Sequence, residues 1–285
     1  MKIKNWLILL TSLVALALIA VGLHTYNTHQ AQNTPDQITV GSQGSDYEVW
    51  QHIAQSPEAK KINLKIAVKQ ITDGVQLNNA TAENNVNVNA FQSYSYLQAY
   101  NKENTKHKLA ALGTTYLEPL GIYSDKYDSL KDIPAGATIA IANNPANTSR
   151  GLLLLQDAGL ITLKKDFGSL GNTKDITANP RDLKFKEIDD TTGPRVLNSV
   201  DAALISNTVA LDGKLNVLHD SLYHEKINQS TKQNINILAT AKGNEHKKSY
   251  QKLVKLYHEP AIQKYIKKQY QGTKIEVEKP LSYLK

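Results

Sequence analysis

Residues 144–160 read NPANTSRGLLLLQDAGL and closely follow an apolar run at residues 137–142. The apolar run is typical of a buried strand. Residues 147–149 are all good N-cap residues, residues 152–155 supply the apolar body of a helix, and Gly159 is of the type that ends one. The stretch therefore predicts a strand, a loop and a buried helix, which is one unit of an α/β fold.

By this interpretation, Arg150 lies in the first turn of the helix. A helix N-terminus offers unpaired N–H groups and partial positive charge. An arginine adds a planar, permanently charged fork that fits a carboxylate. At the carboxyl edge of an α/β sheet, these features predict an anion site. This stretch alone leaves open a solvated arginine in an ordinary first turn.

The amino terminus has the composition of a segment that enters a membrane. Lys2 and Lys4 precede eighteen uncharged, mostly apolar residues at 6–23. As a helix this run would be about 27 Å long, which is near the lower limit for spanning a bilayer. We expect residues 1–23 to be a signal peptide or membrane anchor, and we favour the anchor because no A-x-A cleavage site ends the run. The polar residues 24–37 predict a flexible linker, and the positive flank predicts that the remainder is exported.

Composition narrows the classes of partner. The chain has no cysteine, so an exported domain must rely on its core, and it lacks the thiol that would carry a lipid anchor. The net charge of +7 is modest, and basic residues concentrate at 247–268. That segment is either a solvated face or a contact for anionic wall or lipid. Export argues against nucleic acid as a partner.

Strand and helix patterns alternate along the rest of the chain, which predicts an α/β protein with mostly parallel sheets. The predicted strands are 38–41, 63–68, 86–91, 108–112, 120–124, 137–142, 183–188, 202–205 and 234–240. Besides the Arg150 helix, the predicted helices are 46–55, 74–82, 92–100, 128–134, 194–200 and 247–270, the last as one helix or two. The folded part is large for one core, which favours two lobes.

Catalytic signatures are absent from the sequence. It has no cysteine nucleophile, G-x-S-x-G elbow, H-E-x-x-H motif, P-loop or G-x-G-x-x-G. The eight histidines are scattered, whereas metal sites need clustered ligands. We therefore expect no enzyme activity, no cofactor and no metal. An exported enzyme on a similar scaffold is the competing hypothesis, and it needs a nucleophile–base pair or a metal.

Aromatic and amide side chains stand at or near the ends of several predicted strands. Phe91 and Tyr96 could line a pocket or pack in a core. Asn207 could donate to a carboxylate or cap the next helix. Asn236 lies inside an apolar predicted strand, where an amide must find hydrogen bonds, and this favours a site role.

Four segments together resemble the NlpA-type lipoprotein family, whose best-known members are the methionine-binding receptors of ABC importers. Residues 88–97, VNAFQSYSYL, look like the family's NAFQHxxYL segment. Residues 144–156 look like its NDPTNxGRxLLLLQ segment. Residues 203–208 and 234–238 are similar to its two later asparagine-bearing strands. The resemblance covers about residues 38–270.

The resemblance implies a two-lobed, periplasmic-binding-protein-like (type II) fold with a cleft between the lobes, preceded here by the hydrophobic amino-terminal helix. Lobe one would hold residues 38–118 plus 234–285, and lobe two would hold residues 119–233. The chain would cross the hinge twice.

The resemblance also implies a set of ligand-binding residues. Arg150 would pair with the ligand carboxylate, Asn207 and Asn236 would bind its polar backbone groups, and Phe91 and Tyr96 would enclose its side chain. Ser93 stands where the family has a histidine, and Gly74 stands where it usually has an aromatic residue. The end of the cleft that would hold the ligand side chain therefore departs from the family pattern. The predicted ligand-binding residues are Phe91, Ser93, Tyr96, Arg150, Asn207 and Asn236.

The function implied is that of an extracytoplasmic substrate-binding protein. It would bind an amino acid, methionine or a related one, and deliver it to an ABC permease in the membrane. The alternatives are a receptor for a short peptide, such as a methionine-containing dipeptide, or a non-transport surface adhesin on the same fold. We expect a monomer at the extracytoplasmic face of the cell membrane, or a secreted protein if the signal is cleaved.

Overall fold

The structure is a computed structural model that describes residues 21, 36–168, 170–226 and 229–285. The expected signal peptide or membrane anchor and the linker that follows lie almost entirely outside the described residues. Within the described part, no helix combines the length and the apolar character needed to cross a membrane.

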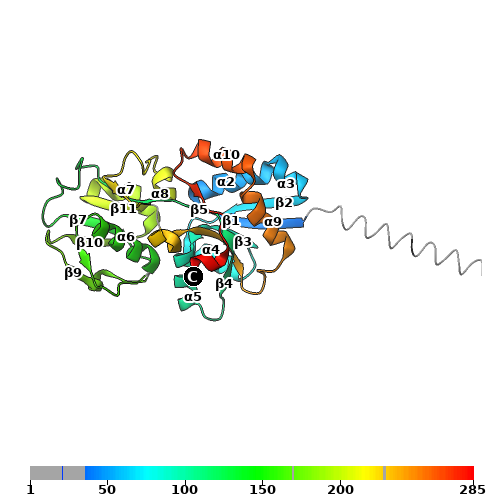
Figure 1. The fold of residues 1–285 in the computed structure, drawn as a ribbon, viewed down its shortest axis with the longest axis horizontal. Coiled ribbons are helices and arrows are strands. Elements are labelled where there is room, and N and C mark those ends of the chain that lie inside the picture. The colour runs from blue at the N-terminus through cyan, green and yellow to red at the C-terminus, as the bar shows by residue number, and fades with distance from the viewer. Residues whose placement is uncertain (1–20, 22–35, 169, 227–228) are drawn as a thin grey trace, which may run out of the picture.

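The strands form two five-stranded sheets that lie side by side (Figure 1). We use the names lobe one and lobe two for the parts that carry the first and second sheet. The first sheet has the order β2-β1-β3-β13-β4 and consists of β1 (Asp36–Ser42), β2 (Leu64–Gln70), β3 (Val88–Ser93), β4 (Leu109–Thr114) and β13 (Asn236–Ala241). The second sheet has the order β10-β7-β11-β6-β12 and consists of β6 (Leu120–Tyr123), β7 (Thr138–Ala142), β10 (Lys184–Ile188), β11 (Ala202–Ser206) and β12 (Tyr223–His224). Two short pairs add β5 (Tyr116–Leu117) with β14 (Ile275–Glu276), and β8 (Thr162–Leu163) with β9 (Ile176–Ala178).

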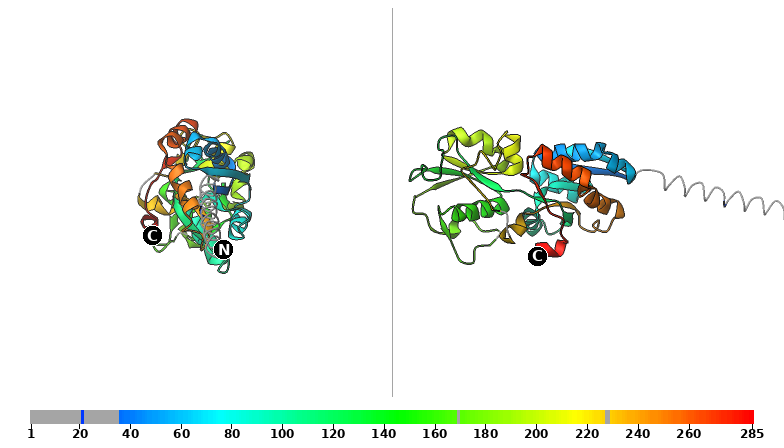
Figure 2. Two further views of the ribbon diagram at one scale, coloured as in Figure 1. Left: turned by 90° about the vertical axis from the view of Figure 1, so that its right-hand side faces the viewer. Right: turned by 45° about the horizontal axis from the view of Figure 1, so that its top comes forward.

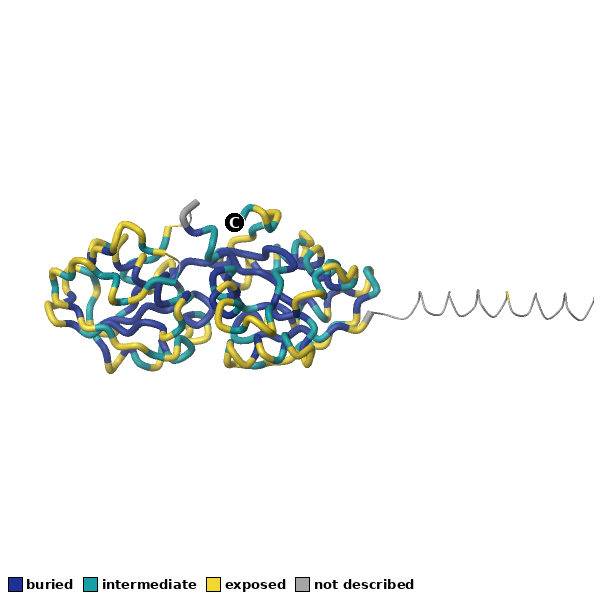
Figure 3. Tube along the Cα trace, turned by 90° about the horizontal axis from the view of Figure 1, so that it is seen from below, coloured by how far each residue is buried: buried dark blue, intermediate teal, exposed yellow. Residues whose placement is uncertain are grey.

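Helices cover both faces of each sheet. The described α-helices are α2 (Gly44–Gln55), α3 (Pro57–Lys61), α4 (Gly74–Ala82), α5 (Tyr94–Glu103), α6 (Pro145–Asp157), α7 (Gly193–Val196), α8 (Asn207–Asp212), α9 (Lys248–Tyr257) and α10 (Pro260–Gln269). In lobe two, leucines of α6 pack on one face of the sheet, while α7 and α8 pack on the other. In lobe one, α2, α9 and α10 cover one face, and α5 lies on the opposite face with the carboxyl-terminal residues. Figure 3 shows the buried strands inside both halves, with exposed chain around them.

The chain passes between the sheets at two places. It leaves the first sheet after β4, passes through β5 and enters the second sheet at β6, and it returns between β12 and β13. Because β13 pairs with both β3 and β4, a late segment of the chain lies in the interior of the first sheet. Figure 2 shows the two halves joined by these few connecting segments.

The expectation of mostly parallel sheets is wrong. The pairings β1–β2, β1–β3, β7–β10 and β7–β11 are parallel. Each hinge crossing then delivers a strand that runs the opposite way, so β13 is antiparallel to β3 and β4, and β6 is antiparallel to β11 and β12. Both sheets are therefore mixed, and in each the antiparallel strand that follows a hinge crossing lies inside the sheet rather than at its edge.

Two local expectations also need correction, and one that was left open is decided. Residues 128–134 form turns rather than a helix, because Pro134 leaves too few residues for a stable one. Residues 247–270, expected as one helix or two, form two, since Pro260 begins α10 and cannot continue α9. β3 runs on to Ser93, and α5 begins only at Tyr94 rather than at residue 92.

Candidate functional site

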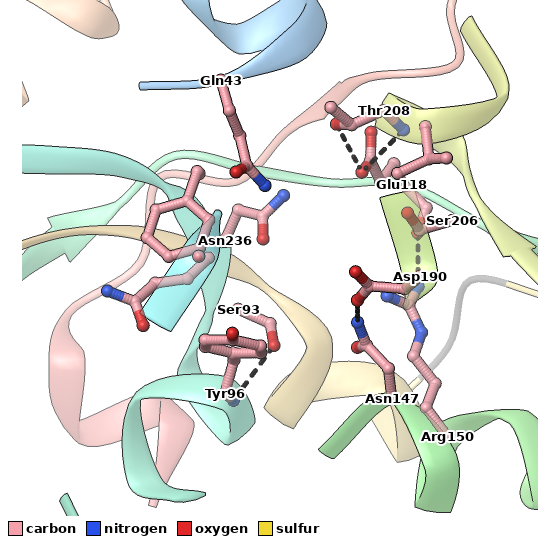
Figure 4. Close-up of a pocket in the computed structure, with 14 residues that line it drawn as sticks. Gln43, Ser93, Tyr96, Glu118, Asn147, Arg150, Asp190, Ser206, Thr208 and Asn236 are labelled. Carbon is pink, nitrogen blue, oxygen red and sulfur yellow. Dashed lines mark hydrogen bonds between the residues drawn. The ribbon is translucent and has the colours of Figure 1, made fainter. Parts of the chain in front are cut away.

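A polar cavity lies between the two lobes, next to the first hinge crossing (Figure 4). Lobe one contributes residues from the carboxyl ends of β1 and β3, from the start of β13 and from the first turns of α4 and α5. Lobe two contributes α6, the ends of β10 and β11, and α8. The lining residues are Gln43, Gly74, Phe91, Gln92, Ser93, Tyr96, Glu118, Asn147, Arg150, Asp190, Ser206, Thr208, Val209 and Asn236.

The start of α6 positions Arg150, but not in the predicted way. The helix begins three to five residues earlier than the candidate caps at 147–149 predict, with Pro145 at its first position and Asn144 as N-cap. The Asn144 side chain accepts a hydrogen bond of 2.9 Å from the Asn147 backbone N–H. Arg150 is therefore in the second turn, and the expectation of an arginine in the first turn is wrong. Its guanidinium still reaches the cavity because the buried face of α6 points toward it.

The Arg150 guanidinium is already partly engaged. Its Nε donates to Glu225 Oε1 at 2.9 Å, and its Nη2 donates to Glu225 Oε2 and to the Glu118 carbonyl. Burial alone would lower the pKa of Arg150, but the adjacent Glu225 carboxylate outweighs that effect and raises it. Among the described residues, Nη1 forms no hydrogen bond, so it is the part of the fork that can receive an anion.

Glu225 ties this arginine to both hinge crossings. Its Oε2 also accepts a hydrogen bond of 3.0 Å from the Leu120 backbone N–H, and its Oε1 accepts one of 3.2 Å from Asn234 Nδ2. The carboxylate thus joins the return crossing to the start of β6. Arg150 is consequently held by groups from the hinge itself, and its orientation depends on how the lobes are arranged.

A second buried charged group lies on the other side of Glu118. Lys274 Nζ is fully buried and lies 3.0 Å from Asp46 Oδ1 and 3.2 Å from Glu118 Oε2. It also contacts the hydroxyl groups of Tyr116 and Thr208. Burial raises the pKa of Asp46, and Lys274 opposes that rise. This cluster joins α2 of lobe one to α8 of lobe two.

Five of the six predicted ligand-binding residues line the cavity together, namely Phe91, Ser93, Tyr96, Arg150 and Asn236. Asn207 is not among the lining residues. Its Nδ2 donates to Glu118 Oε2 at 2.9 Å and to Thr273 Oγ1 at 3.2 Å, and its Oδ1 is buried without a partner among the described atoms. In this arrangement Asn207 positions Glu118, and its contact with a ligand stays a prediction.

The small residues at the side-chain end of the cavity have their own structural roles. A Cβ atom on Gly74 would lie 2.8 Å from the Tyr96 hydroxyl and 2.9 Å from Phe91 Cε2. The rings of Phe91 and Tyr96 pack edge to face with centroids 5.7 Å apart. The two rings therefore occupy space that a larger residue 74 would take. Ser93 caps α5, since its hydroxyl accepts a hydrogen bond from the Tyr96 backbone N–H.

Sequence reasoning missed several residues of the cavity. Gln43 and Asp190 follow β1 and β10, so the strand-end argument that selected Phe91 applies to both. Asn147 drew attention only as a capping residue. Glu225 carries no local signal, because its role comes from a contact with Arg150 across 75 residues.

One group of described residues outside the cavity could offer three ligand atoms to a metal ion. His258, Glu276 and Glu278 have such atoms within 4.8 Å of one another. His258 Nε2 contacts the Thr114 carbonyl, and its Nδ1 lies 2.8 Å from Glu276 Oε1. These two contacts account for the position of His258 without an ion, and the absence of a metal stays a prediction.

Two α/β lobes that enclose a polar cavity at a twice-crossed hinge define a class of protein, the substrate-binding proteins that close on a small ligand. The chain belongs to the NlpA lipoprotein family, whose model matches residues 38–278. It is 39% identical over 226 residues to the methionine-binding lipoprotein MetQ of Bacillus subtilis, covering 78% of this chain and 81% of that protein. The family resemblance is thereby confirmed.

Solved structures confirm the fold class. The structure of protein PG110 from Staphylococcus aureus has a TM-score of 0.83 and 36% identity, covering 87% of this chain and 96% of that one. A nutrient-binding protein from Burkholderia cenocepacia, bound to methionine, has a TM-score of 0.79 and 37% identity, covering 84% and 99%. The expected hydrophobic amino-terminal helix is not tested by these similarities, and it stays a prediction.

Proposed function

We propose that this protein is the extracytoplasmic substrate-binding protein of an ABC importer and that it binds methionine or a related amino acid. The observation that carries the proposal is Arg150, held in the interlobe cavity with Nη1 unbonded among the described residues. The relatives named for methionine binding, and the neighbour with methionine bound, support the choice of ligand.

In this proposal, different residues of the cavity bind the two ends of the ligand. Arg150 Nη1 binds the carboxylate, and Asn236 binds a polar backbone group. Phe91 and Tyr96 enclose the side chain. Closure of the lobes on the ligand would then present the closed form to a membrane permease.

We propose further that the protein is a monomer without catalytic activity at the extracytoplasmic face of the cell membrane. Relatives named as lipoproteins or membrane lipoproteins support this location. No histidine or lysine is among the described lining residues, so the Ser93 and Ser206 hydroxyls have no such base beside them. Turnover of a bound peptide would contradict this part of the proposal.

A thermal-shift screen across amino acids and dipeptides tests the proposal. A ligand that binds only the folded state raises Tm in proportion to ln(1 + [L]/Kd). We expect methionine, or a methionine-containing dipeptide, to give the largest shift. Arg150→Lys keeps the charge but loses the fork, so it should weaken binding at least tenfold, while Arg195→Ala on the exposed surface of lobe two should not. No shift with any ligand would contradict the proposal.

A further inference from the structure

Asp190 is a carboxylate of the cavity that the proposed function does not use. It follows β10 and begins a short 3-10 turn at Asp190–Thr192 in lobe two. Figure 4 shows it beside Asn147, across the cavity from Ser93 and Tyr96. Its negative charge contributes to the raised pKa of Tyr96, after burial, so the two groups influence each other across the cavity.

The side-chain hydrogen bonds of Asp190 reach only one of its oxygens. Oδ2 accepts from Asn144 Nδ2 and from Asn147 Nδ2, each at 2.7 Å. Oδ1 accepts no hydrogen bond from a described side chain. Burial raises the pKa of Asp190 and the neighbouring Asp189 charge raises it further, while the two amides and the Thr191 backbone N–H lower it. No lysine, arginine or histidine of the described chain pairs with it.

The other charged groups of the cavity wall are already matched. Arg150 pairs with Glu225. Glu118 accepts from the backbone and side chain of Thr208 on Oε1 and from Asn207 and Lys274 on Oε2. Both oxygens of Glu118 are thus in use, and Lys274 supplies a cation beside it. Within the described lining, Asp190 is the carboxylate left without a counter-charge.

We infer that Asp190 binds an ammonium group of the ligand. A half-buried carboxylate that no described cation neutralises, and whose Oδ1 receives no side-chain hydrogen bond, gains a charge-assisted hydrogen bond when an ammonium enters. A ligand without that group leaves Asp190 desolvated and unpaired, which is how a polar site rejects an otherwise similar molecule. The inference rests on the proposed function and adds to it the requirement for a free ammonium. That group is either the α-ammonium of an amino acid or the terminal ammonium of a short peptide.

Two matched pairs of ligands test the inference by calorimetry. Methionine and 4-(methylsulfanyl)butanoic acid differ only in the α-ammonium. Glycylmethionine and N-acetylmethionine differ only in the terminal ammonium. We expect the wild-type protein to prefer the ammonium member of one pair at least tenfold, and that pair identifies the source of the ammonium. Asp190→Asn should remove this preference, mostly by weakening the ammonium ligand.

Asp189→Asn is the matched control. It removes the same charge from the preceding residue, whose carboxylate does not line the cavity. It should keep the wild-type preference. Asp190→Ala provides a second variant if the asparagine fails to fold. A wild-type preference that survives in the folded Asp190 variants, or no preference in the wild type, overturns the inference and leaves the proposed function standing. A wild-type protein that binds neither pair and no amino acid or dipeptide overturns both.

Discussion

Arg150 and Glu225 depend on each other at the level of single residues. Both side chains are about nine-tenths buried, with exposures of 8% and 11%. Arg150→Ala should therefore lower the free energy of unfolding by about 3 kcal/mol, because it leaves a buried carboxylate unpaired. Urea unfolding measures this loss, and Arg195→Ala, at an exposed site, should change stability by less than about 0.5 kcal/mol.

A double variant separates the cost of the unpaired charge from lost packing. Arg150→Met combined with Glu225→Leu removes both charges and keeps apolar bulk, so most of the lost stability should return. Ligand binding should stay lost in this variant, since the carboxylate partner is gone. A double variant as unstable as Arg150→Ala would mean that packing, not charge, accounts for the loss.

Gly74 gives a second prediction at the residue scale. Gly74→Ala places a methyl group within 3.0 Å of the Phe91 ring and of the Tyr96 hydroxyl, so Phe91 or Tyr96 must move. We expect ligand affinity to fall about tenfold, measured by calorimetry. Adding Tyr96→Phe removes the closer of the two contacts and should recover part of the loss. Gly168→Ala, where a Cβ meets nothing within 4 Å, is the control and should bind normally.

The site residues that could be predicted are those that a local sequence pattern, such as the end of a predicted strand, points out. Phe91 and Tyr96 lie at or just after the end of one strand, and Arg150 follows another, so strand ends drew attention to them, while Ser93 was named through the family resemblance. Glu225 and Lys274 could not be found this way, because their roles come from contacts 75 and 156 residues away along the chain. Such pairings depend on how the lobes meet, which no local pattern encodes.

At the scale of the element, a glycine-to-alanine substitution should have opposite effects on stability at the end of α6 and in its interior. Gly159 has φ +73°, and Leu160 N–H donates to the Leu155 carbonyl, as in a Schellman motif. Gly159→Ala should cost about 1 kcal/mol, since alanine resists this backbone conformation. Gly151 lies within the same helix, and a Cβ there makes only ordinary contacts of 3.5 Å or more, to Leu204. Gly151→Ala should stabilise the protein by about 0.5–1 kcal/mol.

Urea midpoints of the two α6 variants measure this contrast directly. The same chemical substitution should shift the midpoint in opposite directions within one helix. Shifts of the same sign would show that the helix end is not held as described.

The elements themselves were predictable where hydrophobic periodicity and capping agree. The strand at 137–142 and the helix body at 152–155 are examples. The start of α6 was misplaced because three candidate caps stood at 147–149, while the favourable geometry of Pro145 at the first helical position placed the cap at Asn144. Strand direction was unpredictable, because it depends on which sheet a strand joins after a hinge crossing.

At the scale of the whole molecule, Lys274 links the lobes. It pairs with Asp46 and Glu118, and it donates a hydrogen bond to Thr208 of α8 in lobe two. Lys274→Met should destabilise the protein by about 3–5 kcal/mol, because Asp46 and Glu118 lose their buried cation. Burial already raises the pKa of Asp46 above its ordinary 3.8, and removing Lys274 raises it further. A carboxyl group with a raised pKa favours folding at low pH and loses that contribution as pH rises.

The stability deficit of Lys274→Met should therefore be smallest near pH 4 and grow toward pH 7. Thermal unfolding across this range measures the trend. Lys267→Met on the exposed face of α10 removes the same charge and should show no such growth. A deficit that is independent of pH would contradict the buried-charge explanation.

The place of β13 in the first sheet has a consequence for the order in which the protein folds. Lobe two is built from one continuous stretch, and its last strand ends at His224. The sheet of lobe one lacks the strand between β3 and β4 until Asn236–Ala241 has emerged. During synthesis or export from the amino end, lobe two can fold while β3 and β4 of lobe one still lack the strand that pairs with both. Lobe one is thus begun first and completed last, when β13 takes its place between β3 and β4.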